Sequence, residues 1–183
     1  LVGSEMCIRD RVGTGENNSS RSSYYGIGIL KTDPNGLNWI NVGLIDSHHI
    51  GKILINPNDK DHVIVGVTGH LYSNNKNRGV YVTKDGGNSW KHTLYVNDIT
   101  GVIDMASVPN NFNIIYASTW EKDRKAWNLD EDGKSSAIYK SLDGGETWNK
   151  ISEENSGFPV GEGVGRIGIC LLYTSPSPRD NKA

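Results

Sequence analysis

The sequence predicts an all-β protein, a fragment of a β-propeller with two complete four-stranded blades plus partial blades at each end. Three stretches of the chain align on a tryptophan, at offsets of 51 and 58 residues: Gly28–Trp39, Gly79–Trp90 and Ala137–Trp148. Each stretch is a run of β-branched and aromatic residues, a glycine-containing turn, and a tryptophan that opens a second run, which is the pattern of a β-hairpin. Spacings of about 50 residues are typical of propeller blades rather than of helical repeats.

Two further strands precede each complete hairpin. His62–Thr68 aligns with Asn113–Thr119, and upstream Gly51–Pro57 aligns with Ile103–Pro109. Four strands per repeat is the composition of a propeller blade. We therefore predict a partial blade at 12–47, a complete blade at 48–98, a complete blade at 99–155 with an insertion at 120–135, and the start of the next blade at 156–169, with its first strand at 165–169.

The two ends do not follow this pattern. Met6–Asp10 (MCIRD) and Cys170–Thr174 (CLLYT) can be encoded by one DNA segment and its reverse complement, and the residues on their outer sides extend the match. We therefore expect residues 1–11 and 170–183 to be translated sequencing adapter, and segments of this kind are excluded from fold reasoning.

The composition narrows the classes of function. Both cysteines, Cys7 and Cys170, fall in those ends, so the repeats themselves can hold no disulfide and no thiolate metal site. The formal net charge of −2 argues against nucleic acid as a partner, because nucleic-acid-binding domains carry basic patches. The apolar runs are too short to span a membrane. The loop GTGENN lacks the GK(S/T) ending of a phosphate loop, and we expect no cofactor.

The hairpin turns carry a motif that two repeats share in full. Thr83-x-Asp85-x-Gly87-x-Ser89-Trp90 and Ser141-x-Asp143-x-Gly145-x-Thr147-Trp148 both read (S/T)-x-D-x-G-x-(S/T)-W, and in the first repeat Pro34 takes the aspartate position. This motif resembles the Asp-box of bacterial neuraminidase repeats. With GTGENNSSRSS and HHIGKILI, the chain is similar to large secreted bacterial propellers that are labelled sortilin-like or glycosyl-hydrolase-like. The resemblance implies the fold more specifically than it implies a function.

The motif residues themselves point to a structural role. A turn aspartate accepts backbone hydrogen bonds, a turn glycine adopts a conformation that other residues disfavour, and the tryptophan packs under the turn. The two aspartates recur once per blade on outer hairpins, so they are not expected to share a cleft as a catalytic pair. The residues to which we assign this structural role are Asp85, Gly87, Trp90, Asp143, Gly145 and Trp148.

Three charged residues align at one level of the predicted innermost strands: Lys52, Asp104 and Arg166. They either face a central channel, where propellers bind ligands, or form an ion pair between blades. Asp104 is the one acid outside the turn motif that lies within such a strand. It is therefore the single candidate for a catalytic carboxylate.

Two other polar segments are candidates for binding. Glu16, Asn17 and Arg21 lie in a polar, glycine-containing loop, and loops between strands often carry binding residues. The alternative is ordinary turn chemistry. His49 follows His48 at the entrance of a predicted strand, but a zinc site needs further ligands and the sequence indicates none.

The insertion at 120–135 contains two tryptophans, Trp120 and Trp127, which either form a stacking platform for sugar rings or fold the loop onto its blade. Asp130 and Asp132 belong to a segment that resembles the opening of a calcium loop. The twelfth position of that loop is Tyr139, which cannot supply the bidentate carboxylate. We therefore expect no metal site, with Asp130 and Asp132 as the residues that a calcium contact would use.

The sequence favours a non-catalytic propeller segment of a larger secreted or cell-envelope protein. It would scaffold or bind an unidentified protein, peptide or glycan and contact neighbouring blades of the parent chain. The alternative is a fragment of a glycoside hydrolase of the sialidase or xyloglucanase type, which needs two carboxyl groups across a cleft. A sialidase also needs clustered arginines, and those of the repeats are scattered: Arg21, Arg78, Arg124 and Arg166.

Overall fold

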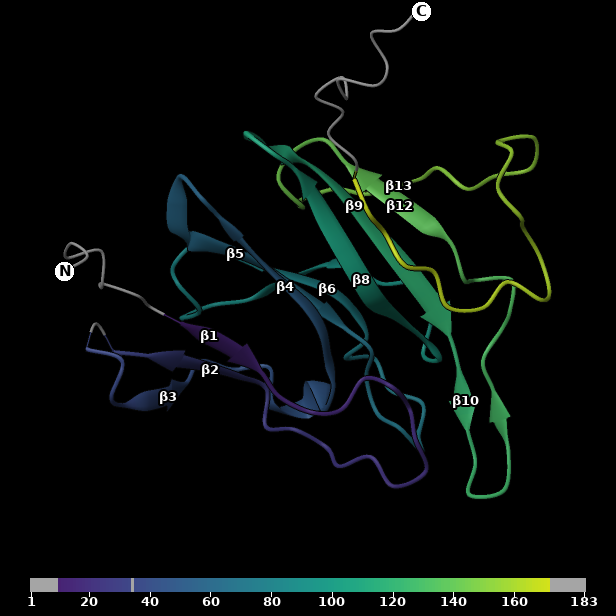
Figure 1. Ribbon diagram of the computed structural model, residues 1–183, viewed down its shortest axis with the longest axis horizontal. Helices are drawn as coiled ribbons and strands as arrows, with labels where there is room; N and C mark the ends of the chain where they lie inside the picture. The colour runs from purple at the N-terminus through teal and green to yellow at the C-terminus, as the bar shows by residue number, and fades with distance from the viewer. Residues whose placement is uncertain (1–9, 34, 172–183) are drawn as a thin grey trace, which may run out of the picture.

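The computed structural model describes residues 10–33 and 35–171, and its strands form successive antiparallel sheets (Figure 1). The first sheet has three strands in the order β1 (Arg11–Gly13), β2 (Ile29–Thr32) and β3 (Trp39–Asn41). The short 3-10 helix η1 (Ile45–Ser47) leads from it into the next sheet. The predicted adapter segments, apart from residues 10, 11, 170 and 171, lie outside the described residues, and Arg11 already belongs to β1.

Two four-stranded sheets follow, which confirms the prediction of two complete blades. The strands of the second sheet, in sheet order, are β4 (Ile50–Asn56), β5 (Asp59–Val67), β6 (Gly79–Thr83) and β7 (Lys91–Leu94). Those of the third are β8 (Thr100–Val108), β9 (Asn111–Glu121), β12 (Ile138–Ser141) and β13 (Asn149–Lys150). The insertion between β9 and β12 forms a separate hairpin of β10 (Asp123–Arg124) and β11 (Leu129–Asp130).

The predicted strand at 165–169 is wrong, because this segment has no strand conformation. Its backbone binds side chains instead of a partner strand. Ile167 O accepts a hydrogen bond from Ser118 Oγ at 2.7 Å, and Ile169 N donates to Asp104 Oδ2 at 3.1 Å. A strand is defined by its ladder, and in the described part of the chain no second strand pairs with this segment.

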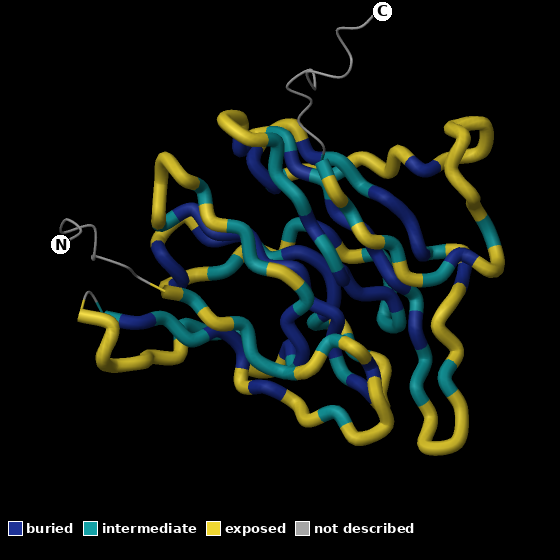
Figure 2. Tube along the Cα trace, viewed as in Figure 1, coloured by how far each residue is buried: buried dark blue, intermediate teal, exposed yellow. Residues whose placement is uncertain are grey.

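The apolar core lies between the sheets, and strand β5 contributes side chains to the core on both of its faces. Because successive side chains of a strand point to opposite faces, Val63, Val65 and Val67 pack with Ile29 and Ile50 against the first sheet. Ile64, on the other face of β5, packs in a second cluster with core residues of the third sheet. Figure 2 shows the result, with buried residues along the central strands and exposed residues at the loop tips.

The hairpin turns are built as the sequence predicted. Thr83 Oγ1 donates to Asp85 Oδ1 at 2.7 Å and accepts from Gly87 N at 3.0 Å, while Ser89 N donates to the same carboxylate at 2.9 Å. The second turn repeats these contacts through the corresponding side chains, Ser141, Asp143 and Thr147. In the degenerate first turn, Asp33 accepts from the backbone N–H groups of Asn35 and Leu37. Each aspartate is therefore bound within its own turn.

Each turn also docks onto the preceding sheet. Trp90 Nε1 donates to Val42 O at 2.7 Å, and Trp148 Nε1 donates to Thr93 Oγ1 at 3.2 Å. Gly145 has φ of 92° and lies so close to the preceding sheet that a Cβ would approach Ile64 Cδ1 to 2.8 Å. Only glycine meets both conditions without strain.

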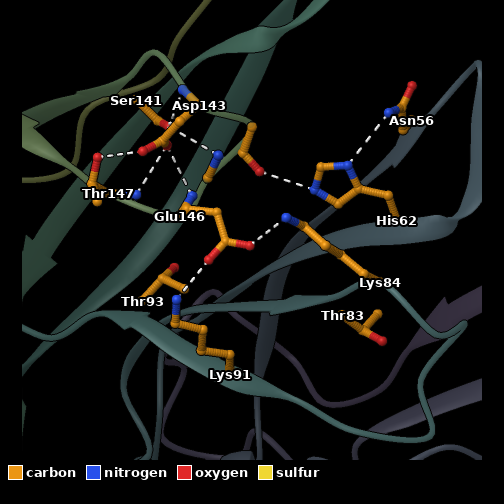
Figure 3. A network of polar contacts seen from close by, with 12 residues as sticks. Asn56, His62, Thr83, Lys84, Lys91, Thr93, Ser141, Asp143, Glu146 and Thr147 are labelled. Atoms are coloured by element: carbon orange, nitrogen blue, oxygen red, sulfur yellow. Dashed lines mark hydrogen bonds and ion pairs between the residues drawn. The ribbon is translucent and has the colours of Figure 1, made fainter.

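Charged and polar groups surround the second of these turns (Figure 3). Lys84 Nζ and Lys91 Nζ each lie 2.7 Å from a carboxylate oxygen of Glu146, and His62 Nε2 lies 3.0 Å from Gly144 O. The two lysines and His62 belong to the second blade, whereas Glu146 and Gly144 belong to the third. The turn is thus a joint between blades.

We expect Trp148→Ala to destabilise the protein by about 2–3 kcal/mol, somewhat less than the roughly 3–5 kcal/mol lost when a fully buried tryptophan is truncated, because Trp148 is half-buried. Urea denaturation followed by circular dichroism measures the change. The matched control is Trp127→Ala, since Trp127 is 85% exposed and its loss should shift stability by no more than about 0.5 kcal/mol. Equal effects of the two substitutions would contradict the docking role.

Acid should weaken the turns. Burial alone would raise the pKa of Asp143, but hydrogen bonds from Thr147, Ser141 and Glu146 outweigh it and lower that pKa to about 2. A carboxylate whose pKa is lower in the folded state stabilises the fold above its unfolded pKa, and this contribution disappears as pH falls through the folded value. Wild-type stability should therefore decrease between about pH 4 and pH 2, and Asp143→Asn should have a flatter profile in the same urea titration. Parallel profiles would contradict this assignment.

Candidate functional site

The fold brings together two of the three charged residues predicted for a central channel. Lys52 Nζ on β4 lies 3.3 Å from Asp104 Oδ1 on β8, which is the ion pair between blades that the sequence left open. Asp104 also accepts hydrogen bonds from Met105 N at 2.9 Å and Ile169 N at 3.1 Å. Arg166 does not join this pair, and its guanidinium lies over the Trp120 ring at 5.7 Å. Asp104 is thus engaged by structural contacts.

The two tryptophans of the insertion do not form a platform. Trp120 is 2% exposed, and its indole N–H donates to Glu131 O at 2.8 Å, so it folds the insertion onto the blade. Trp127 is exposed in the turn that connects β10 to β11. Figure 1 shows this hairpin extending from the third sheet. Trp120 is therefore excluded as a binding residue, because a buried indole with its single donor already used presents no surface to a ligand.

The calcium candidates do not come together either. Asp130 Oδ1 accepts a hydrogen bond from Asn128 Nδ2 at 2.8 Å, and Asp132 is exposed. Within residues 10–33 and 35–171, no three histidine, cysteine or acidic side chains are arranged to hold a metal ion. The same ranges contain no helix that is long and apolar enough to cross a membrane.

The polar loop between β1 and β2, residues 14–28, is fastened to three places on the following blades. Asn17 Nδ2 donates to Gly51 O at 3.2 Å, the Tyr72 hydroxyl donates to Arg21 O, and Lys122 Nζ donates to Ser19 Oγ at 2.7 Å. Of the residues predicted to bind a ligand, Asn17 therefore has an anchoring role and Arg21 contributes its backbone. Glu16 is exposed on the same loop.

This loop frames a pocket of about 260 Å³, which we call the loop-face pocket. The wall is built from three loops, one before β2, one before β4 and one after β5. His49 is the one predicted site residue that lines it. The lining residues are Ser23, Tyr25, His48, His49, His70, Leu71, Tyr72 and Ser73.

Stacked rings define the pocket. The imidazoles of His48 and His70 stack with centroids 3.7 Å apart, and the Tyr25 ring lies 5.2 Å from His48. His48 has φ of 58° and ψ of −48°, outside the αL region, and His49 N donates to Ser47 O at 2.7 Å across it, as in a γ-turn. Partial burial, followed by repulsion from His70, lowers the pKa of His48, while Asp46 raises it. His70 Nε2 donates to Asp46 O at 3.0 Å, which leaves Nδ1 to accept from Ser73 Oγ at 2.9 Å when the ring is neutral.

A buried arginine holds the third loop in place. Arg78 is 2% exposed and donates hydrogen bonds at 2.8–3.2 Å to five oxygens: Thr68 O, His70 O, Ser73 O, Asn75 Oδ1 and Ile99 O. Burial lowers its pKa to about 10, so the guanidinium remains charged at neutral pH. The planar five-donor fork of arginine matches this set of acceptors, and the compact ammonium of lysine does not.

Further buried nitrogen groups lie behind the pocket. Burial lowers the pKa of Lys122 to about 7, with smaller contributions from Arg78 and Arg166. Burial, and then Lys122, lower the pKa of His49 to about 4, so this imidazole is neutral at neutral pH. Lys122 also lies over the Trp120 ring at 5.4 Å. Neither Arg78 nor Lys122 forms an ion pair with a carboxylate in the described part of the chain.

A solved structure shares this arrangement of sheets. No protein-family model and no curated protein matches the chain. An ancestral GH74 enzyme matches with a TM-score of 0.53 and 18% identity, over 78% of this chain and 18% of the enzyme. The GH74 xyloglucanase from Xanthomonas campestris (TM-score 0.37, 15% identity, 68% and 27% covered) and a GH74 enzyme from Niastella koreensis (0.39, 12%, 68% and 26%) are more distant.

The described sheets are consecutive β-propeller blades. The likeness to the ancestral GH74 enzyme shows the β-propeller fold, at an identity too low to transfer an activity. This chain spans less than a fifth of the length of the ancestral enzyme.

Most residues of the propeller's pocket escaped sequence reasoning. Tyr25, His70, Tyr72, Arg78 and Lys122 are far apart in the sequence and belong to no motif. The sequence singles out the pair His48–His49, but the ring that stacks on it, His70, follows 21 residues later on another loop. No spacing rule connects such positions, because each loop leaves a different strand end.

Arg78→Lys should destabilise the propeller by about 2–3 kcal/mol, since several carbonyls lose a charged donor and lysine cannot reach them all. The free energy of unfolding in urea measures this loss. Arg21→Lys is the control: the side chain of Arg21 is exposed and its contact to Tyr72 is through the backbone, so stability should change by less than about 0.5 kcal/mol. An unchanged unfolding midpoint for Arg78→Lys would show that the arginine does not hold the loop.

Proposed function

We propose that this chain is part of a non-catalytic β-propeller of a larger secreted or cell-envelope protein, which binds a protein, peptide or glycan ligand in the loop-face pocket. The observation that carries this proposal is the lining of the pocket. It consists of tyrosine and histidine rings, serine hydroxyls and one leucine, held by a buried arginine, and contains no carboxylate. Aromatic surfaces with a few fixed polar groups are typical of binding sites.

The hairpin turns support a place among the Asp-box propellers labelled sortilin-like. In both complete blades the aspartate carboxylate is bound by the hydroxyl and backbone groups of its own turn, as a structural motif requires. Side-chain and backbone hydrogen bonds from Ser89 hold the pKa of Asp85 well below its usual range. A carboxylate in this state is a poor general acid, because it stays ionised. We therefore assign Asp85 and Asp143 to the fold and not to chemistry.

The second candidate function is that of a glycoside hydrolase, which the likeness to an ancestral GH74 enzyme favours. Hydrolysis usually needs two carboxyl groups about 5–10 Å apart across a cleft. Asp104 is the sequence-predicted candidate, and it is bound by Lys52 and by two backbone N–H groups. A hydrolase would have to supply a second carboxyl opposite Asp104 from elsewhere in the parent protein.

We also propose that nucleic acid is not a partner, in keeping with the net charge of −2.

Binding by the pocket can be tested with two adjacent tyrosines. Tyr25 and Tyr24 are 70% and 78% exposed, but only Tyr25 lines the pocket. In a screen of glycan and peptide arrays, followed by calorimetry on each hit, Tyr25→Ala should weaken binding at least tenfold, the equivalent of about 1.4 kcal/mol. Tyr24→Ala should leave it unchanged. Equal effects of the two variants, or no effect of either, would refute the pocket as the binding site.

Catalysis is tested separately with aryl glycosides and xyloglucan oligosaccharides. We expect no turnover from the wild-type chain. Turnover that disappears in Asp104→Asn, with an unchanged unfolding midpoint, would replace the binding proposal by the hydrolase.

A further inference from the structure

The buried charged groups next to the lining of the loop-face pocket are basic. Arg78 donates to the carbonyls of His70 and Ser73, two lining residues, so its positive charge lies directly behind the pocket wall. Lys122 is close enough to His49, another lining residue, to lower its pKa. Both side chains are 2% exposed, and Arg78 is the one that stays charged at neutral pH. A buried charge is costly unless it is paired, and an anion in the pocket would supply the missing charge.

The acids near the site are few and lie outside the lining. Asp46 raises the pKa of His48, and Asp123 and Asp98 raise the pKa of Arg78, but none of the three lines the pocket. Asp98 already accepts the hydroxyl of Tyr95, and Asp123 pairs with Lys125 at 2.8 Å. The lining itself carries His48, whose ring nitrogens make no hydrogen bond within the described residues. The hydroxyl of Ser23 already donates to Asn18 Oδ1, and that of Tyr72 donates to the carbonyl of Arg21. A protonated His48 is therefore the charged donor that the lining offers to a ligand.

The pocket also suits a ring better than an extended peptide. An extended peptide is bound mainly through main-chain hydrogen bonds to a free edge. Here the backbone carbonyls of four lining residues are already used: His48 O by Gly26 N, His49 O by Thr68 N, and His70 O and Ser73 O by Arg78. What remains exposed are the rings of Tyr25 and Tyr72, at 70% and 49%. A volume of about 260 Å³ is below the roughly 300–1,000 Å³ of drug-sized sites and fits a single small unit.

We propose that the loop-face pocket binds a carboxylate-bearing sugar residue, a hexuronate within an acidic polysaccharide, with its ring against Tyr25 and Tyr72 and its carboxylate at His48. This inference rests on the proposed binding function and names its ligand class. Protonation of His48 adds a charged donor, and a bound carboxylate favours that protonation. Affinity should therefore rise as pH falls through the His48 range, below the usual histidine value of about 6.5.

The experiment is calorimetry on the full chain with three matched probes: tri-galacturonate, its methyl ester and a tri-glutamate peptide. Tri-galacturonate should bind at least tenfold more tightly than its ester. Its affinity should increase severalfold from about pH 7.5 to about pH 5.5. His48→Asn replaces the titratable ring by a neutral amide, and it should remove the pH dependence and reduce the preference for the acid. Tyr24→Ala is the control and should behave like wild type.

The outcomes separate this inference from the proposed function. Equal affinity for the acid and its ester would refute the carboxylate, and tri-glutamate binding as tightly as tri-galacturonate would refute the sugar. If no saccharide binds but a peptide from the wider screen binds through Tyr25, the ligand class is wrong and the binding function stands. If Tyr25→Ala changes the binding of no ligand, both are wrong.

Discussion

The contact on which the rest of the structure depends is the docking of each glycine-containing turn against the preceding blade. A single blade buries only part of its apolar surface, so it must stack on a neighbour. Trp90 reaches back to Val42 O and Trp148 reaches back to Thr93 Oγ1, which fixes successive blades at equivalent positions. The same docking sets where the loops at the strand ends emerge, and so it positions the pocket.

The wall of the pocket depends on two buried basic side chains, Arg78 and Lys122, which form no ion pair with a carboxylate in the described part of the chain. Arg78 donates to five acceptors from loop and strand-end residues, and thereby holds the loop after β5 in place as one wall of the pocket. Lys122 ties the loop of the first sheet to the third through Ser19. Hydrogen bonds offset the cost of burying the Arg78 charge, and the cavity beside it has no acidic side chain in its lining. Structure and recognition therefore use the same residues.

The fold was more predictable than the site, for a reason visible in particular residues. The alternation of β5 and the turn motif around Asp85 and Asp143 are local patterns, and each recurs in the chain. The strand predicted at 165–169 failed because a strand also needs a partner, and no partner is present among the described residues. Trp120 was a reasonable binding candidate by composition, but its position at the end of β9 places its indole under the insertion, where Glu131 O accepts its proton.

The sequence by itself determined the all-β class, the two four-stranded blades and the construction of the turns, because these follow from hydrogen bonds and side-chain alternation within about 50 residues. Only the tertiary structure decided which polar residues meet. It paired Lys52 with Asp104, turned Arg166 toward Trp120, and stacked His48 on His70. Those contacts join loops from different blades, and their geometry is set by how the sheets pack, which no local pattern encodes.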